Sequence, residues 1–122
     1  MILLAALIAP THPELQMPAA FRGNWIDVGK GCNSGEIGAH LYVTRGKLSD
    51  GEFDQLLNRV QIVSPRHVVV WATADTEHPQ SHLTYDLRLR ADGKMERRWA
   101  QGHRSASARF AREIDVRCGP AE

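Results

Sequence analysis

The chain has two cysteines, and they stand near opposite ends of its strand-rich part. Cys32 follows the first strand-like segment, and Cys118 ends the last one. An even number of cysteines in a short exported chain is typical of a disulfide. A Cys32–Cys118 bridge would hold the first and last strands side by side. In an all-β chain, neighbouring first and last strands predict a closed barrel.

The first residues favour export. Residues 2–9 form an uninterrupted apolar run. A bilayer span needs about 20 residues, whereas roughly 7–15 suffice for a signal-peptide core. No Lys or Arg precedes the run, so a helix or strand of the fold is the alternative, but Pro10, Pro13 and Pro18 oppose continuous structure there. We predict that residues 1–20 are a signal peptide and proline-rich leader, that residues 21–122 form one β-barrel domain, and that the protein is periplasmic or secreted.

Length and charge fit a single small domain. The chain has 122 residues and a formal net charge of +1, which gives no general attraction for nucleic acid. Basic residues gather late in the chain, and such a cluster could bind an anionic surface. Acidic residues lie between them, so we interpret the cluster as a solvated outer face. Its members are Arg88, Arg90, Lys94, Arg97, Arg98 and Arg104.

Short strand-like segments alternate with turn signals along the domain. Their spacing is near the 8–12 residues typical of sandwiches and barrels. No segment offers a long helical crossover, so the strands should be antiparallel. The sequence predicts an all-β, up-and-down, eight-stranded barrel. The expected strands are 23–28, 40–44, 47–53, 56–63, 67–73, 82–90, 94–101 and 110–118.

Two local features are specific enough to check. Asp92-Gly93 between two alternating segments predicts a hairpin with a type I′ turn. Residues 52–60 are ambiguous, because Phe53, Leu56, Leu57 and Val60 also fit a helical period after a capping box. A helix there would cover one barrel end.

Alternation assigns an inner face to the last strand. Residues at even positions from Phe110 to Cys118 are mostly apolar, and Arg112 falls among them. We therefore expect Arg112 to point inward. A buried arginine must be paired or stacked, and Trp25 on the adjacent first strand is its natural partner.

The same reasoning selects side chains that could line a ligand cavity. The expected lining residues are Val70, Leu83, Tyr85, Leu87 and Phe110. Because small barrels are commonly packed solid, the presence of a cavity stays open at this point.

Gly23-Asn24-Trp25 at the start of the first strand resembles the Gly-x-Trp signature of lipocalin-like (calycin) barrels. The resemblance implies that Trp25 closes one barrel end and that an arginine of the final strand packs across it. Arg112 would match that arginine, or Arg117 if the register differs. The Thr-Asp-Tyr loop of lipocalins is absent.

The chain also partly resembles the small periplasmic metalloprotease inhibitors of proteobacteria. They share the Gly-x-Trp start and a cysteine soon after it, although their second cysteine lies mid-chain. In that family the N-terminal tail enters the protease cleft. By this resemblance, residues 11–20 would be the tail.

Catalytic and metal chemistry find little support. Asp75, Glu77, His78 and His82 could surround a metal, but Pro79 breaks their spacing, and we interpret them as a polar loop. There is no Gly-x-Ser-x-Gly elbow, phosphate loop or Cys-x-x-Cys. We expect no enzyme activity, no cofactor and no metal.

These observations favour a monomeric, non-enzymatic exported binding protein without a transmembrane segment. Its ligand would be a small apolar molecule. The alternative is an inhibitor or interaction protein for a periplasmic or secreted hydrolase, acting through the N-terminal tail or the open-end loops.

Overall fold

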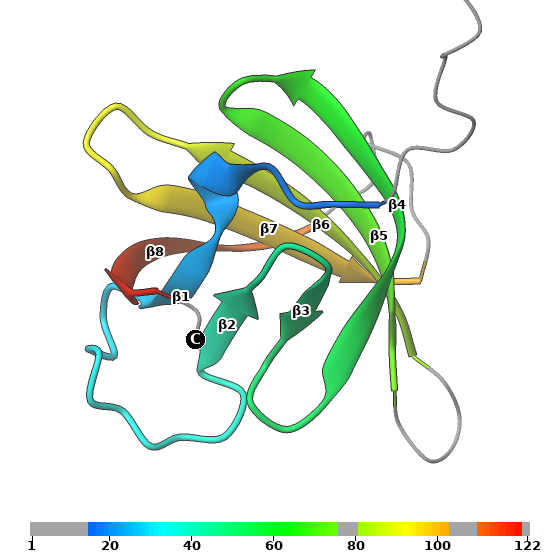
Figure 1. Ribbon diagram of the computed structural model, residues 1–122. Helices are drawn as coiled ribbons and strands as arrows, with labels where there is room; N and C mark the ends of the chain where they lie inside the picture. The colour runs from blue at the N-terminus through cyan, green and yellow to red at the C-terminus, as the bar shows by residue number, and fades with distance from the viewer. Residues whose placement is uncertain (1–14, 76–80, 103–109, 121–122) are drawn as a thin grey trace, which may run out of the picture.

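The computed structural model describes residues 15–75, 81–102 and 110–120 and contains a closed barrel of antiparallel strands (Figure 1). Each strand pairs with the next along the chain, and the last pairs with the first. This confirms the predicted eight-stranded up-and-down barrel. The strands are β1 (Gly23–Asp27), β2 (His40–Val43), β3 (Lys47–Ser49), β4 (Asp54–Ser64), β5 (His67–Ala74), β6 (Ser81–Leu89), β7 (Met95–Gln101) and β8 (Ala111–Gly119).

The two ends of the barrel differ. In an up-and-down barrel, successive connections alternate between ends. The long β1–β2 loop, residues 28–39, therefore shares one end with the β3–β4 turn, residues 50–53, and we call this the open end. The other end carries the β2–β3 turn and is crossed by the segment before β1 (Figure 1). We call it the closed end.

The closed end is sealed by the segment 17–21, of which the sequence assigned all but Phe21 to the leader. Met17 and Phe21 are fully buried in the barrel core, and the Met17 N–H donates to the Arg45 carbonyl at 2.8 Å. A short 3₁₀ helix, Ala19–Phe21, turns the chain into β1. Residues 17–20 are thus part of the barrel, while residues 1–14 lie outside the described residues. Among the helices described, none is long and apolar enough to cross a membrane.

The region 52–60 is a strand, so the helical alternative is wrong. β4 pairs with β5 along nearly its whole length. Gln55 and Leu57 face the interior, and Leu56 is 58% exposed. The register shifts between Leu57 and Arg59, and again near Ser64. These bulges break the two-residue period, which is why the apolar pattern resembled a helix.

The β6–β7 hairpin is present, but its turn is not type I′. That turn needs positive φ at both central residues, and among the described residues only glycines have positive φ. The Gly93 N–H donates to the Arg90 carbonyl, and Gly93 has φ +87°. The turn is therefore a type I turn followed by a left-handed glycine. Asp92 supports it by accepting the Lys94 N–H at 3.0 Å.

The inner face predicted for β8 is the wrong one. Pairing places Glu113 opposite Arg97 and Asp115 opposite Met95, so the odd-numbered residues face inward. Arg112 points outward, is 62% exposed and contacts Glu96 at 3.0 Å. The even-numbered, mostly apolar residues of β8 lie on the outside of the barrel, where Cys118 is bonded to the β1–β2 loop. Apolar character on that phase therefore does not mark the barrel interior.

Candidate functional site

A cavity of about 260 Å³ opens inside the barrel at its open end. β2, β4, β6, β7 and β8 all contribute to its wall, and the β1–β2 loop and the β3–β4 turn form its rim. Its lining combines apolar, aromatic and charged side chains. The lining residues are Gly38, Leu41, Asp50, Gln55, Leu83, Tyr85, Arg97, Trp99, Gln101 and Glu113. We call this space the mouth cavity.

Aromatic side chains form part of the wall because two strands place them side by side. Tyr85 on β6 pairs with Trp99 on β7, and Leu83 lies one step closer to the open end. The Tyr85 hydroxyl donates to Gln55 Oε1 at 2.6 Å. Burial raises the pKa of Tyr85 to about 12, so the phenol stays neutral.

The adjoining part of the wall is charged. Arg97 on β7 contacts both Glu113 and Asp115 on β8. Its Nε lies 2.8 Å from Asp115 Oδ2, and its Nη2 donates to Asp115 Oδ1 at 3.3 Å and to Glu113 Oε2. The guanidinium also lies 5.6 Å from the centre of the Trp99 ring. One cation therefore serves two carboxylates.

Asp115 is the most deeply placed of these acids, with no exposed surface. Burial raises its pKa to about 8, and a hydrogen bond with Glu113 adds to the rise, while Arg97 opposes it. At neutral pH Asp115 is therefore mainly protonated.

Of the predicted lining residues, only Leu83 and Tyr85 lie in the wall of the mouth cavity. Val70 and Leu87 are fully buried in the packed core. Phe110 is not inside the barrel, because its phase on β8 is the outer one, and Arg98 lies over its ring at 5.4 Å.

Sequence reasoning missed the charged wall. Arg97 was expected on a solvated outer face, yet its side chain is only 10% exposed and lies inside the barrel. The alternation Met95, Arg97, Trp99 on β7 was the available signal, because all three share one face. Glu113 was missed because β8 was assigned the opposite phase.

Barrel closure involves Gly23 and Trp25 as expected, but with Arg117 as the arginine. The Arg117 guanidinium lies 4.5 Å from the centre of the Trp25 ring and donates to the Ala20 carbonyl at 2.7 Å. Trp25 Nε1 donates to the Phe21 carbonyl at 2.9 Å. Gly23 has φ +149°, and a Cβ there would meet Arg117 Nε at 3.1 Å. A side chain at position 23 would therefore disturb this closure.

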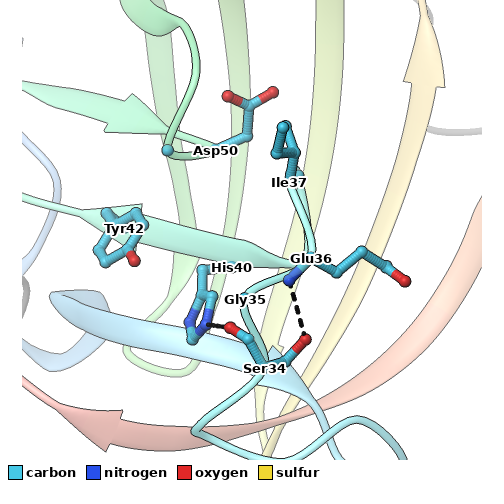
Figure 2. Close-up of a pocket in the computed structure, with 9 residues that line it drawn as sticks. Ser34, Gly35, Glu36, Ile37, His40, Tyr42 and Asp50 are labelled. Atoms are coloured by element: carbon cyan, nitrogen blue, oxygen red, sulfur yellow. Dashed lines mark hydrogen bonds between the residues drawn. The ribbon is translucent and has the colours of Figure 1, made fainter.

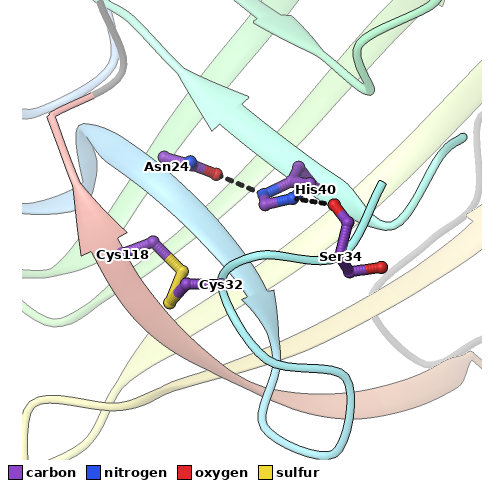
Figure 3. Close-up of a disulfide and its surroundings, with 5 residues drawn as sticks. All are labelled: Asn24, Cys32, Ser34, His40 and Cys118. Carbon is purple, nitrogen blue, oxygen red and sulfur yellow. Dashed lines mark hydrogen bonds between the residues drawn. A yellow bond between two sulfur atoms is a disulfide. The ribbon is translucent and has the colours of Figure 1, made fainter. Parts of the chain in front are cut away.

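The expected disulfide is present. Cys32 and Cys118 are bonded, with their Cα atoms 5.6 Å apart, and the bridge joins the β1–β2 loop to β8 (Figure 3). His40 holds the same loop from the other side. Its ring nitrogens lie 2.8 Å from Asn24 Oδ1 and 3.1 Å from the Ser34 carbonyl (Figure 3). The loop that forms the cavity rim is thus fixed at two points.

A second hollow, of about 220 Å³, lies between this loop, β2 and the β3–β4 turn (Figure 2). We call it the side groove. His40 and Tyr42 stack along it, with ring centres 5.5 Å apart, and Ile37 is 77% exposed at the loop tip. Asp50 and Gly38 belong to both the side groove and the mouth cavity.

In the loop that we interpret as polar rather than metal-binding, Glu77 and His78 lie outside the described residues. Within the described part of the chain, no group of three or more acidic, histidine or cysteine side chains is arranged to hold a metal. A scan of protein-family models and searches of curated proteins and solved structures return no significant match to this chain.

Proposed function

We propose that this protein is a non-enzymatic binding protein that takes a small molecule into the mouth cavity. The observation that carries the proposal is the cavity itself, a space with aromatic and charged walls that opens at one end of the barrel beside a packed hydrophobic core. Ligand pockets of about 300–1,000 Å³ hold drug-sized molecules, so this cavity suits a smaller ligand.

The lining favours binding over catalysis. Among the described residues that line the cavity, none is a serine, cysteine or histidine. Two of its charged groups, Arg97 and Glu113, are engaged with one another. The lipocalin-like resemblance of Gly23 and Trp25, joined by Arg117, supports the same proposal, since a barrel interior is where such proteins would hold a ligand. The ligand would be amphipathic rather than purely apolar.

The compartment is part of the proposal. The Cys32–Cys118 bridge supports a periplasmic or secreted location, because disulfides persist in oxidising environments.

The alternative function, a hydrolase inhibitor, could act through the N-terminal tail or through the open-end loops, and the tail has less support. Residues 17–21 cross the closed end and are bonded to it, so the part of the predicted tail from Met17 onward is engaged within the barrel. The exposed Ile37 on the disulfide-held loop is the feature that would favour an open-end version.

A fragment screen by NMR tests the proposal. Binding should shift the Trp99 indole N–H and the cavity-lining amides in a saturable manner. Leu83→Trp should abolish the shifts by filling the cavity, whereas Leu56→Trp, on the exposed side of β4, should leave them unchanged. Shifts confined to Ser34, His40 and Tyr42 would instead place the ligand in the side groove and contradict the proposal.

A further inference from the structure

The walls of the mouth cavity carry more negative than positive groups. Asp50 lies at the rim, and Glu113 lies in the wall with Asp115 behind it on the same face of β8. Arg97 is the single cation among the described residues that line the cavity. Since one guanidinium can neutralise only one carboxylate, this part of the barrel has an excess of negative charge.

Hydrogen bonding within the charged wall is incomplete. The Arg97 Nη2 group donates to Glu113 and Asp115, and the Tyr85 hydroxyl donates to Gln55. Asp115 Oδ2 and Arg97 Nε are both buried and lie 2.8 Å apart, but they make no aligned hydrogen bond. One buried carboxylate oxygen of this wall therefore has no well-aligned donor.

When the cavity holds no ligand, a bound proton offsets part of the excess negative charge of this wall. The raised pKa of Asp115 means that this buried carboxyl, in the ion-pair group with Arg97 and Glu113, is mainly protonated at neutral pH. Buried carboxylates that cannot find a cation commonly neutralise themselves in this way. A cationic group that entered the cavity would take over that role.

We infer that the mouth cavity selects a small organic cation, with one ammonium or guanidinium group on a flat apolar body. The inference rests on the proposed function and specifies its ligand class. The cationic group would lie against Glu113 and Asp50, and the body would pack on Trp99, Tyr85 and Leu83. An anionic ligand would face the same carboxylates, and a neutral one would leave their charge uncompensated.

Three probes with the same body and different end groups test the inference. They are 2-phenylethylamine as its ammonium, 2-phenylethanol and 3-phenylpropanoate, each titrated at pH 7 while the Trp99 indole N–H is followed by NMR. We expect the ammonium to bind about tenfold or more tightly than the alcohol, the size of a charge-assisted hydrogen bond. The carboxylate should bind more weakly than the alcohol.

A matched pair of variants locates the preference. Glu113→Gln removes a cavity carboxylate and should abolish the ammonium preference while binding of the alcohol persists. Glu96→Gln removes the same charge from the outer face, where Glu96 contacts Arg112, and should leave the preference intact. Equal binding of ammonium and alcohol, or a preference for the carboxylate, would overturn the cation inference but leave the binding proposal standing. If none of the three probes binds, the inference also fails, and the fragment screen then decides whether the cavity binds anything.

Discussion

Two arginines of β8 meet different surroundings. Arg117 covers the Trp25 ring and holds the Ala20 carbonyl, whereas Arg112 reaches only Glu96 on the outer surface. Arg117→Ala should lower the free energy of unfolding by about 1–2 kcal/mol, since it removes a cation–π contact and a charge-assisted hydrogen bond. Arg112→Ala should cost less than about 0.5 kcal/mol, as exposed ion pairs usually do. Urea denaturation of both variants measures the difference, and equal effects would refute the assignment of Arg117 to closure.

Asp115 makes stability depend on pH in an unusual direction. Its pKa is raised in the folded protein from 3.8 to about 8, so the folded state holds a proton that the unfolded state releases above pH 4. Its contribution should therefore destabilise the fold progressively as pH rises from about 4 to 8.

Asp115→Asn mimics the protonated form and should remove that decline. We expect the variant to be at least as stable as the parent at pH 5 and more stable at pH 8.5, measured by chemical denaturation at both values. Asp54→Asn, in an exposed pair with Lys47, is the control and should not alter the slope. A parent protein whose stability rises between pH 5 and 8.5 while Asp115→Asn follows the same curve would contradict this account.

At the scale of elements, the β1–β2 loop depends on its two attachments. The disulfide spans 86 positions of sequence. The chain-entropy model gives such a bridge about 4 kcal/mol of stability. The Cys32→Ser, Cys118→Ser double variant should lose stability of this order in urea denaturation, with the m-value read as a check on the unfolded state.

Hydrogen exchange tests where in the structure the loss of stability begins. In the double variant, amides of residues 28–39 should exchange faster before the rest of the barrel, because the loop would lose its covalent link to β8 and keep hydrogen bonds such as those of His40 with Asn24 and Ser34. The β4–β5 hairpin, whose pairing lies elsewhere in the sheet, serves as the internal reference. Unchanged exchange in the loop would mean that the bridge does not fix the cavity rim.

The same elements show what sequence patterns could and could not predict. β6 alternates without interruption and β5 is a run of β-branched and aromatic residues, and both ranges are predicted within one residue. β4 contains two register shifts, so its period is disguised. In β8 the apolar residues face outward under the disulfide-bonded loop, and only the pairing with β1 and β7 reveals which phase is inside. Pairing register is a property of two strands and is not encoded in either one alone.

For the whole molecule, the closed barrel was predictable from two features. Cysteines stand near both ends of the strand-rich part, and the number of expected strands is enough to close a barrel. The mouth cavity was only partly predictable. Leu83 and Tyr85 were found through alternation, whereas Arg97 and Glu113 were not, because charged residues are normally assigned to the surface. A charged pair inside a barrel is visible only after the phases of both strands are known.

The closed end predicts where the stable protein must begin. Met17 and Phe21 are buried there, and removing such side chains typically costs about 2–5 kcal/mol each. A chain starting at Leu15 should therefore unfold at the same urea concentration as the full chain, while one starting at Gly23 should be much less stable or fail to fold. If the protein is exported, intact mass should place the mature N-terminus at or before Gln16. Cleavage after Ala9 fits this expectation, whereas cleavage near Ala20 would remove Met17. A barrel from Gly23 that equals the full chain in stability would show that the preceding segment is not part of the closure.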